Sequence, residues 1–291
     1  MSQVKGATIG MFDGVHLGHQ YLISQLKEQC DEPLVVTFDN HPLWVIRPQR
    51  EPHLLLTPRE KEKVLRDIGV NPVMLHFDDT LRALTAEQFI DRLTRDHGIQ
   101  RLVLGFDNRI GSDRCDITAD RRLTHATGVE IIRATELPGN VKVNSSAIRK
   151  MLAEGDVAGA SHLLGRPYTL HGTVDHGKQL GRRLGFPTAN LHPDNADKLI
   201  PLNGVYAADA VTSDGHSYRA VVNIGSRPTV DRPEAPVTIE AHLDGFTGNL
   251  YDSDLTLQFL TRMRDEQRFP DLDTLRNAIQ TDLTLARTLP H

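Results

Sequence analysis

Two histidines near the start of the chain are its first candidates for chemistry. His16 and His19 lie in the octet Phe12-Asp13-Gly14-Val15-His16-Leu17-Gly18-His19, where a strand-like run gives way to a helix-like one. Open α/β sheets bind ligands at such turns, and the amides at a helix N-terminus attract anions. We therefore predict that both imidazoles donate to phosphate oxygens, in an arrangement that suits an α-phosphate under attack.

The tetrapeptide His-x-Gly-His is a moderate signal when taken alone. It is expected by chance in roughly one chain in twenty of this composition, so surface histidines at a helix start are the alternative. Position favours the phosphate site, because Gly14 and Gly18 let the backbone approach a ligand closely. The sequence contains no Walker-type Gly-x-x-x-x-Gly-Lys-Ser/Thr loop that would compete for a nucleotide.

A second anion site is predicted at the start of another helix. Ser145, Ser146 and Arg149 place two hydroxyls and a guanidinium within the first turns of a helix-like run. Such groups bind phosphate oxygens well. A capping serine followed by an exposed arginine is the alternative, and the two interpretations have about even weight for this segment taken alone.

The stretch from 172 to 190 combines a glycine-rich loop with two oxygen ligands. Four glycines allow the backbone to wrap a polyanion, and they are Gly172, Gly177, Gly181 and Gly185. Thr188 and Asn190 are two apart on an extended segment, so they point to the same face. Their oxygens suit Mg²⁺ that keeps most of its waters. A structural loop with a capped turn is the alternative.

Glu240 is a candidate general base on an alternating run, Thr238–Leu243. Its neighbours Ile239 and Ala241 face the opposite side of a strand, so the carboxylate can project toward a cavity. A glutamate on an isolated strand is more often simply solvated.

The first half of the chain has the alternating pattern of a parallel sheet flanked by helices. The predicted strands are Val4–Phe12, Leu34–Phe38, Val73–Phe77, Arg101–Phe106 and Val129–Ala134. The predicted helices are Gly18–Gln29, Pro58–Ile68, Ala86–His97 and Ala119–Thr127. Capping-box patterns at Thr57–Glu60 and Thr85–Gln88 predict where the second and third of these helices begin.

In the second half the helical periodicity ends after two short helical runs, Ser146–Leu152 and Val157–Leu164. Short β-type runs then follow, punctuated by Gly, Pro, Asn and Asp, which is typical of a barrel or sandwich. These runs are Tyr168–Val174, Gly204–Val211, Tyr218–Ile224, Thr238–Leu243 and Leu255–Phe259. Apolar residues at helical spacing predict a terminal helix over Leu272–Leu289, packed on the barrel.

Composition excludes several classes of protein. The chain has 291 residues, 39% of them hydrophobic, and its 33 basic and 38 acidic residues give a net charge of −5. Neither half is basic, so nucleic-acid binding is not indicated. The two cysteines, Cys30 and Cys115, form no zinc or disulfide pattern. No apolar run approaches the length of a membrane span, and Met1–Gly6 has no leader pattern, so we expect a cytoplasmic protein.

The octet and the segment Ser145–Arg149 resemble the adenylyltransferase module of bacterial bifunctional riboflavin kinase/FAD synthetases. Thr37–Pro42 and Gly105–Gly111 fall where that family has similar segments. The resemblance implies that His16 and His19 are catalytic and that Asn108 lies near the flavin. The ATP-binding residues that it implies are Phe12, Asp13, Gly14, His16, Gly18, His19, Ser145, Ser146 and Arg149.

The second half resembles the riboflavin kinase module, through 172–190 together with Gly204–Ala207 and Asn223–Thr229. Glu240 matches the catalytic carboxylate of that module. Arg264, Glu266 and Phe269 match an Arg-x-Glu-x-x-Phe segment, which implies a flap over the isoalloxazine. The ATP-binding residues that it implies are Gly172, Gly177, Gly181, Gly185, Thr188 and Asn190, the last two also holding Mg²⁺.

The resemblance covers nearly the whole chain and implies a two-step flavin nucleotide enzyme. Residues 1–158 would form a Rossmann-like FMN adenylyltransferase domain, and residues 159–291 a six-stranded Greek-key β-barrel riboflavin kinase domain with a terminal helix. Riboflavin would be phosphorylated by ATP to FMN, and FMN adenylylated by a second ATP to FAD with release of pyrophosphate.

Two other functions remain open. Asn144–Ala147 departs from the family's usual Ser-Ser-Thr pattern, which motivates a flavin-binding or sensing protein that has lost turnover. Activation of another phosphorylated small molecule is the third interpretation, and the attached kinase module argues against it.

Overall fold

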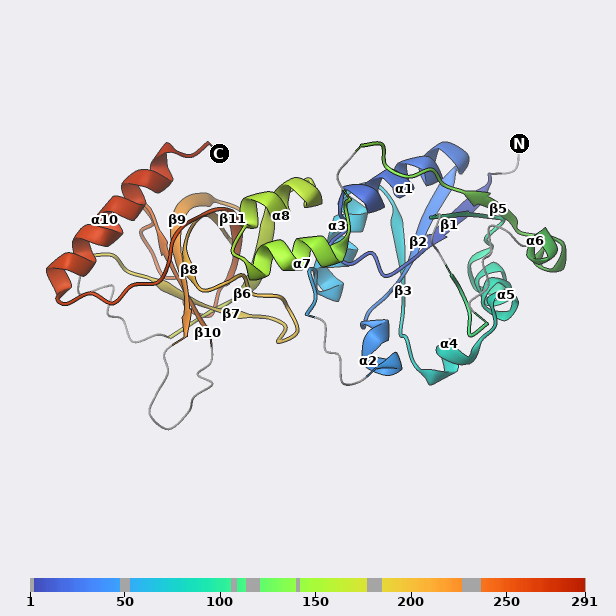
Figure 1. The fold of residues 1–291 in the computed structure, drawn as a ribbon, viewed down its shortest axis with the longest axis horizontal. Helices are drawn as coiled ribbons and strands as arrows, with labels where there is room; N and C mark the ends of the chain where they lie inside the picture. The colour runs from blue at the N-terminus through green and yellow to red at the C-terminus, as the bar shows by residue number, and fades with distance from the viewer. Residues whose placement is uncertain are drawn as a thin grey trace. The chain divides into compact units, whose positions relative to one another are not determined.

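The computed structural model describes residues 3–47, 53–105, 109–113, 121–139, 142–176, 185–226 and 237–290. The chain divides into two compact units, residues 1–145 and 146–291 (Figure 1). This division precedes the predicted boundary at 158/159, because helices α7 (Ser145–Ala153) and α8 (Val157–Leu164) fall almost entirely in the second unit. Helix α8 packs against strands of that unit. The extent of each functional module stays a prediction.

The first unit is built on a parallel sheet, as predicted. In the described part of this unit the strands are β1 (Lys5–Ile9), β2 (Glu32–Phe38), β3 (Asn71–Leu75), β4 (Arg101–Leu104) and β5 (Glu130–Arg133). Their order is β3-β2-β1-β4-β5, and all neighbours are parallel. The order reverses between β1 and β4, so ligands are expected at the carboxyl ends of these strands. The octet follows shortly after β1.

Helices cover both faces of this sheet (Figure 1). They are α1 (Leu17–Gln29), α3 (Pro58–Asp67), α5 (Ala86–His97) and α6 (Arg121–Thr127), whereas the short helices α2 (Pro42–Ile46) and α4 (Asp79–Ala83) lie in the connections that follow β2 and β3. Helix α5 buries Phe89, Ile90 and Leu93 on one face. On the other, Ile23 of α1 and Leu65 of α3 pack together with a β2 valine.

Both capping boxes form as predicted. Thr57 Oγ1 accepts from Glu60 N while Glu60 accepts from Thr57 N, and Thr85 and Gln88 make the same pair of bonds. The sequence did not predict α2 or α4. Each has five residues, which is too short for a helical period to show.

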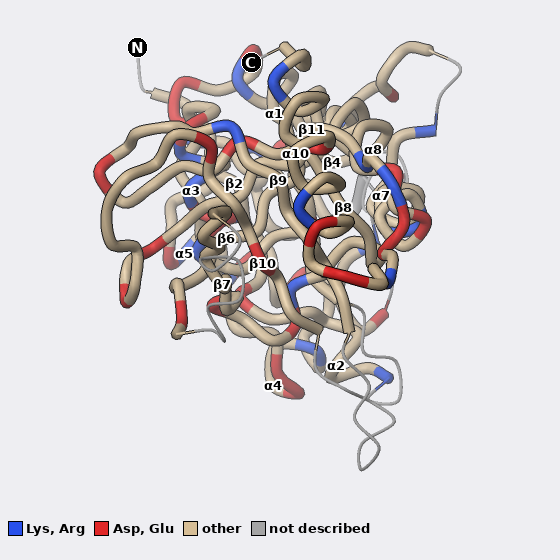
Figure 2. The backbone as a smooth tube through the Cα atoms, turned by 90° about the vertical axis from the view of Figure 1, so that its left-hand side faces the viewer, with Lys and Arg blue, Asp and Glu red and all other residues tan. Residues whose placement is uncertain are grey.

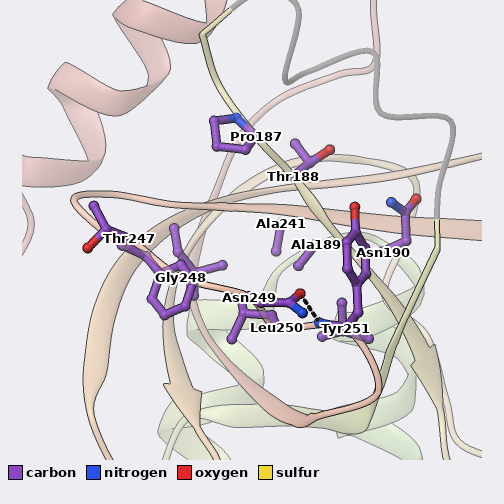
Figure 3. Close-up of a pocket in the computed structure, with 13 residues that line it drawn as sticks. Pro187, Thr188, Ala189, Asn190, Ala241, Thr247, Gly248, Asn249, Leu250 and Tyr251 are labelled. Atoms are coloured by element: carbon purple, nitrogen blue, oxygen red, sulfur yellow. Dashed lines mark hydrogen bonds between the residues drawn. The ribbon is translucent and has the colours of Figure 1, made fainter.

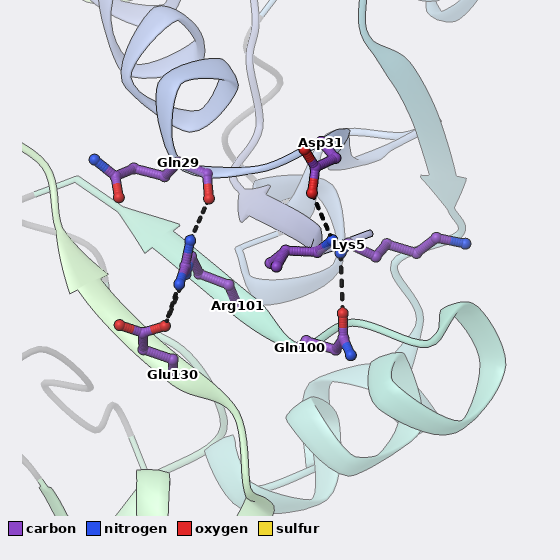
Figure 4. A network of polar contacts seen from close by, with 7 residues as sticks. Lys5, Gln29, Asp31, Gln100, Arg101 and Glu130 are labelled. Carbon is purple, nitrogen blue, oxygen red and sulfur yellow. Dashed lines mark hydrogen bonds and ion pairs between the residues drawn. The ribbon is translucent and has the colours of Figure 1, made fainter. Parts of the chain in front are cut away.

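A polar network ties the strands together at the opposite edge of the sheet (Figure 4). The Arg101 guanidinium donates to Glu130 Oε2 at 2.8 and 2.6 Å and to the Gln29 carbonyl. Lys5 N donates to Gln100 Oε1 at 3.1 Å. These bonds connect the amino ends of β1, β4 and β5 with the end of α1. They stabilise the sheet at the end opposite the octet, so they leave the predicted ligand site open.

The second unit is a closed antiparallel barrel, as predicted. Among the residues described, its strands are β6 (Tyr168–Asp175), β7 (Ala189–Pro193), β8 (Gly204–Thr212), β9 (Ser217–Ser226), β10 (Val237–Leu243) and β11 (Asp254–Arg264). They close in the order β10-β7-β6-β11-β8-β9. The sequence predicted only an extended segment where β7 forms.

The predicted terminal helix is confirmed as α10 (Leu272–Thr288). Its Leu283 and Ala286 pack on Val205, Ala207 and Val221 of the barrel. In Figure 2 basic and acidic residues are interspersed along the described chain in both units. Within the described residues, no helix combines the length and the apolar character that a bilayer crossing needs.

Candidate functional site

The paired imidazoles meet at the N-terminus of α1. His16 is the N-cap, and its Nδ1 accepts from His19 N at 3.2 Å. The two rings stack, with centroids 3.6 Å apart and planes at 13°. Because Nδ1 accepts a hydrogen bond, a neutral His16 carries its proton on Nε2. The structure thus brings together the two histidines that the sequence singled out, beside the helix amides.

The loop that carries His16 has a strained backbone. Phe12 and Val15 have positive φ angles of 48° and 39°, which non-glycine residues adopt at a cost of order 1–3 kcal/mol. Gly14 adopts φ +88° without that cost. The Phe12 ring is buried and lies 4.9 Å from the His19 ring. Such strain is found where a loop must present a site, and here the loop presents the histidines.

Gly18 lets the loop close tightly. A Cβ at this position would lie 3.3 Å from the His16 ring and 3.5 Å from the Val143 carbonyl. A side chain at 18 would crowd the His16 imidazole, which would have to move by a few tenths of an ångström.

Asp13 has a supporting role that the sequence did not indicate. Its carboxylate is buried and accepts from Leu55 N at 3.0 and 3.1 Å and from Leu56 N at 3.1 Å. The Asp13 carbonyl accepts from Ser145 Oγ at 2.8 Å. Ser145 therefore contacts the octet, as an anion site shared between them requires.

Replacing Asp13 by alanine is expected to lower the free energy of unfolding of the first unit by about 2–6 kcal/mol. Two buried amides lose their acceptor, at about 1–3 kcal/mol for each unsatisfied group. Asp13→Asn keeps one acceptor oxygen and should cost less. Urea unfolding measures both, and an unchanged midpoint for Asp13→Ala would contradict the supporting role.

Ser146, Arg149 and Asn108 are the other residues predicted for this site. Ser146 and Arg149 lie in the first turns of α7 after Ser145. Their contact with ATP stays a prediction. Asn108 lies outside the described residues, but Arg109 and Ile110 line a large cavity in the same unit.

This cavity of about 960 Å³ opens at the carboxyl ends of β1 and β2. Its wall includes Met11 and the rings of Phe38 and Phe77, which pack edge to face with centroids 5.4 Å apart. Pro42, Leu84 and Phe89 also line it. A cavity with this apolar lining suits a flat aromatic ligand. The sequence did not predict it, because its wall comes from many separate segments.

In the barrel, strand register brings Glu240 beside one of the predicted magnesium ligands. Glu240 on β10 pairs with Asn190 on β7 and with Asn223 on β9, and Asn190 pairs in turn with Asp175 on β6. Directly opposite residues share a face, with Cβ atoms roughly 5 Å apart. We call Asn223, Glu240, Asn190 and Asp175 the polar row. The sequence did not predict that Asn223 and Asp175 would join it.

The alternation predicted around Glu240 is confirmed. Ile239 and Ala241 are buried, with exposed fractions of 2% and 0%, whereas Glu240 is half-buried on the other face. The carboxylate is therefore directed away from the aliphatic interior.

A second cavity, of about 460 Å³, has Asn190 of the polar row in its wall, whereas Glu240, Asn223 and Asp175 are not among the described residues that line it (Figure 3). Thr188 and Asn190 line one side of it, and the 246–251 loop lines the other. Figure 3 shows the Tyr251 side chain extending from that loop toward Thr188 and Asn190. The His176 ring stacks on Tyr251 at 4.0 Å. A hydroxyl and an amide oxygen at the wall of a cavity fit a hard cation.

The segment that carries Thr188 is anchored from β10. His242 Nδ1 lies 2.8 Å from the Pro187 carbonyl, and the His242 ring packs edge to face on Phe186. Gly185 adopts φ +87° at the start of this segment. These contacts fix the chain just before Thr188.

The glycines of the predicted phosphate loop differ in their surroundings. Gly177 and Gly181 lie outside the described residues. Gly172 lies within β6, where a Cβ would overlap the His192 carbonyl of β7 at 2.1 Å. Close strand packing accounts for glycine there, and Gly172 is not among the described residues that line the cavity. Its contact with ATP stays a prediction.

The three predicted flap residues lie close to the end of β11. Arg264 donates to both carboxylate oxygens of Asp282 on α10, at 2.7–3.2 Å, and its guanidinium lies 5.7 Å from the Phe269 ring centroid. Glu266 packs so closely on Gly225 that a Cβ there would lie 2.0 Å from Oε1. Asp282, which the sequence did not single out, therefore orients the predicted flavin contact.

Asp282→Asn is expected to lower the free energy of unfolding by about 2 kcal/mol, because Arg264 loses its charged partner while remaining partly solvated. It should also raise the KM for riboflavin more than the KM for ATP. Steady-state kinetics with each substrate varied checks this, and an equal change in both KM values would contradict a specific role at the flavin.

Comparison with known proteins matches the two halves of the chain to two family models. The FAD synthetase family model matches residues 2–147, and the riboflavin kinase family model matches residues 164–289. A bifunctional riboflavin kinase/FMN adenylyltransferase of Pseudomonas fluorescens is 39% identical over 97% of this chain and 92% of its own length. The chain belongs to the bifunctional riboflavin kinase/FMN adenylyltransferase family. The resemblance predicted from the sequence is thereby confirmed.

Other members and one solved structure extend the likeness. A bifunctional riboflavin kinase/FMN adenylyltransferase of Bacillus subtilis is 35% identical over 94% of this chain and 89% of its own. A solved structure named as a macrolide-efflux protein from Streptococcus pneumoniae has a TM-score of 0.89, with 28% identity over 100% of this chain and 96% of that one. The paired histidines fall in the segment matched by the adenylyltransferase part of the family, and Glu240 in the segment matched by the kinase part.

Proposed function

We propose that this chain phosphorylates riboflavin in its barrel and adenylylates the resulting FMN in its parallel-sheet unit. One observation carries the proposal. Each of the two matched family segments contains its own cavity and its own polar site, the stacked histidines in one and the polar row in the other. A cytoplasmic location, where ATP is available, is part of the same proposal.

In the barrel, Glu240 accepts the proton of the riboflavin 5′-hydroxyl as that oxygen attacks the γ-phosphorus of ATP. The new bond is between this oxygen and the γ-phosphorus, and the bond to the β-phosphate oxygen breaks to release ADP. Because phosphoryl transfer has a loose transition state, alignment and charge neutralisation contribute most of the catalysis. Glu240 contributes proton removal, and the 246–251 loop orients the nucleotide.

Magnesium fits the residues present at this site. Thr188 and Asn190 offer neutral oxygens on one wall of the cavity, and no cluster of three or more His, Cys, Asp or Glu suited to a metal occurs among the described residues. A cation at such ligands is held chiefly by nucleotide phosphates. When bound, it neutralises charge that develops on those phosphates.

In the parallel-sheet unit, a phosphate oxygen of FMN attacks the α-phosphorus of a second ATP. The bond between the α-phosphorus and the bridging oxygen breaks, and pyrophosphate leaves. The nucleophile is already anionic, so this step needs no general base. His16 and His19 orient and stabilise the five-coordinate phosphorus through N–H donors, and Ser145, Ser146 and Arg149 hold the departing phosphates.

The 960 Å³ cavity takes the isoalloxazine ring of FMN in this proposal. Its wall, formed by Phe38, Phe77 and Met11, matches a flat apolar ring system. The cavity begins at Gly10 and Met11, directly before the histidine loop, so its occupant lies close to the reacting phosphates.

The test is incubation of the purified full chain with riboflavin and MgATP, and in parallel with FMN and MgATP, followed by chromatography of the flavins. Both FMN and FAD are expected from the first mixture and FAD from the second. FMN alone would show that the adenylyltransferase site is inactive. No product, with flavin still bound, would favour the alternative of a flavin-binding or sensing protein.

A further inference from the structure

Lys61 is a buried cation to which neither reaction assigns a role. It lies on α3 with an exposed fraction of 2%. Its Nζ donates to the carbonyl oxygens of Met11 at 3.1 Å and Phe38 at 2.6 Å. Burying an ammonium group is costly even when it is hydrogen-bonded, and an aliphatic side chain would fill this space at lower cost. The charge at this position therefore points to a function other than packing.

The two carbonyls that Lys61 binds belong to two parts of the proposed active site. Met11 directly precedes Phe12, where the strained histidine loop begins, and its carbonyl also accepts from Thr37 Oγ1 at 2.8 Å. Phe38 is the last residue of β2 and carries one of the rings of the 960 Å³ cavity. One ammonium group therefore joins the histidine loop to the wall of the flavin cavity.

The charges around Lys61 keep it protonated at neutral pH. Burial lowers the pKa of its ammonium to about 8, while the nearby carboxylates of Asp13 and Asp39 act in the opposite direction. Asp39 is itself paired with the exposed His76, at 2.9 Å. The neutral amine has one donor fewer and lacks charge assistance, which roughly doubles the strength of a hydrogen bond. Its hold on the two carbonyls should therefore weaken above neutral pH.

We propose that Lys61 is a positioning residue for adenylyl transfer, whose ammonium group fixes the Met11 and Phe38 carbonyls and so holds the His16–His19 loop against the FMN cavity. The proposal rests on the function proposed above for this unit. Lys61 acts through the loop and touches neither substrate. Its effect should appear in kcat, because a displacement of about 1 Å in a reacting group can cost about 10²-fold in rate.

The first test is Lys61→Met, assayed in the full chain. The kcat for conversion of FMN to FAD at neutral pH is expected to fall by about 10²-fold, while riboflavin phosphorylation by the same preparation stays at the wild-type rate. The urea midpoint should fall modestly, because the Phe38 carbonyl loses its donor while the desolvated charge is also removed. Loss of FAD synthesis with riboflavin phosphorylation unchanged, in a preparation that is still folded under the assay conditions, separates positioning from a structural role.

The second test uses the wild-type chain and needs no variant. Its FAD synthesis is expected to fall as pH rises through about 8, and Lys61→Met should lack this step. Titration of Lys61 does not itself favour unfolding over this pH range. Because the pKa of Lys61 is lower in the folded chain than its ordinary 10.5, the unfolded chain binds more protons between these values, and stability gained from this group rises with pH.

Two results would overturn the proposal. One is a Lys61→Met kcat within about threefold of wild type, and the other is a wild-type profile without the step near pH 8. If Lys61→Met fails to fold, Lys61→Gln is assayed in its place, with the same expected fall in kcat and the same absence of the step near pH 8. The same assays distinguish this failure from failure of the proposed function. If Lys61→Met and His16→Asn both keep FAD synthesis, the assignment of the adenylyltransferase site is wrong. If Lys61→Met keeps FAD synthesis and His16→Asn loses it, only the role of Lys61 is rejected.

Discussion

Glu240→Gln is expected to lower the kcat of riboflavin phosphorylation by about 10²–10⁴-fold, the range of general-base catalysis. Glutamine has nearly the same shape but cannot accept the proton of the 5′-hydroxyl. Glu240 is not among the described residues that line the barrel cavity, and Thr188 and Asn190 of its wall are unchanged, so the Kd for ATP should change little. Conversion of FMN to FAD in the same chain should keep its wild-type rate.

Stopped assays of each half-reaction, together with calorimetric titration of ATP, measure these effects. Asp254→Asn is a matched control, because it removes another carboxylate from a barrel strand at an exposed position outside the polar row. It should leave both activities unchanged. Equal losses in kcat and in ATP affinity for Glu240→Gln would show that Glu240 contributes to binding and not to proton removal.

Periodicity and caps predicted the scaffold well because they act locally. The capping boxes at Thr57 and Thr85 depend on residues three apart, and the parallel strands contain short apolar runs such as Leu102–Leu104 of β4. Strand β7 was missed as a strand because it is short, follows Pro187 closely and includes an asparagine, a histidine and a proline among its five residues. Its pairing with β6 and β10 compensates for its weak local preference.

The candidate sites were predictable where their residues are neighbours in sequence and not where the fold assembles them. His16 and His19 form one helix cap, so their spacing alone predicts that they meet. The pairing of Glu240 with Asn190 depends on barrel register, which no local pattern reports. The bonds from Asp13 to Leu55 and Leu56 likewise join distant segments.

Lys61 is recognisable in the sequence as a charged residue at a position where α3 should be apolar. It is four residues before Leu65 and so lies on the apolar stripe of α3, on the buried side of an otherwise charged helix. A lysine within such a stripe departs from the binary pattern, and departures of this kind are expected at functional sites.

Replacing His16 should abolish FAD synthesis and leave FMN synthesis intact, but the choice of residue matters because His16 is also the N-cap of α1. Asparagine is a good N-cap and keeps an acceptor for His19 N, whereas alanine loses the cap at a cost of about 1 kcal/mol. His16→Asn therefore removes the Nε2 donor while preserving the helix start. Removal of one such donor costs about 10²–10³-fold in kcat.

His16→Asn, His16→Ala, His19→Ala and the double variant form one series. All four should lose FAD synthesis. Only the two variants with alanine at position 16, His16→Ala and the double variant His16→Ala/His19→Ala, should unfold at a lower urea concentration than the wild type. Because the two rings stack at 3.6 Å and act on one phosphate, the double variant should lose less than the product of the single losses. FAD synthesis by His16→Asn within about threefold of wild type would show that the helix cap, and not the imidazole, is what the reaction requires of His16.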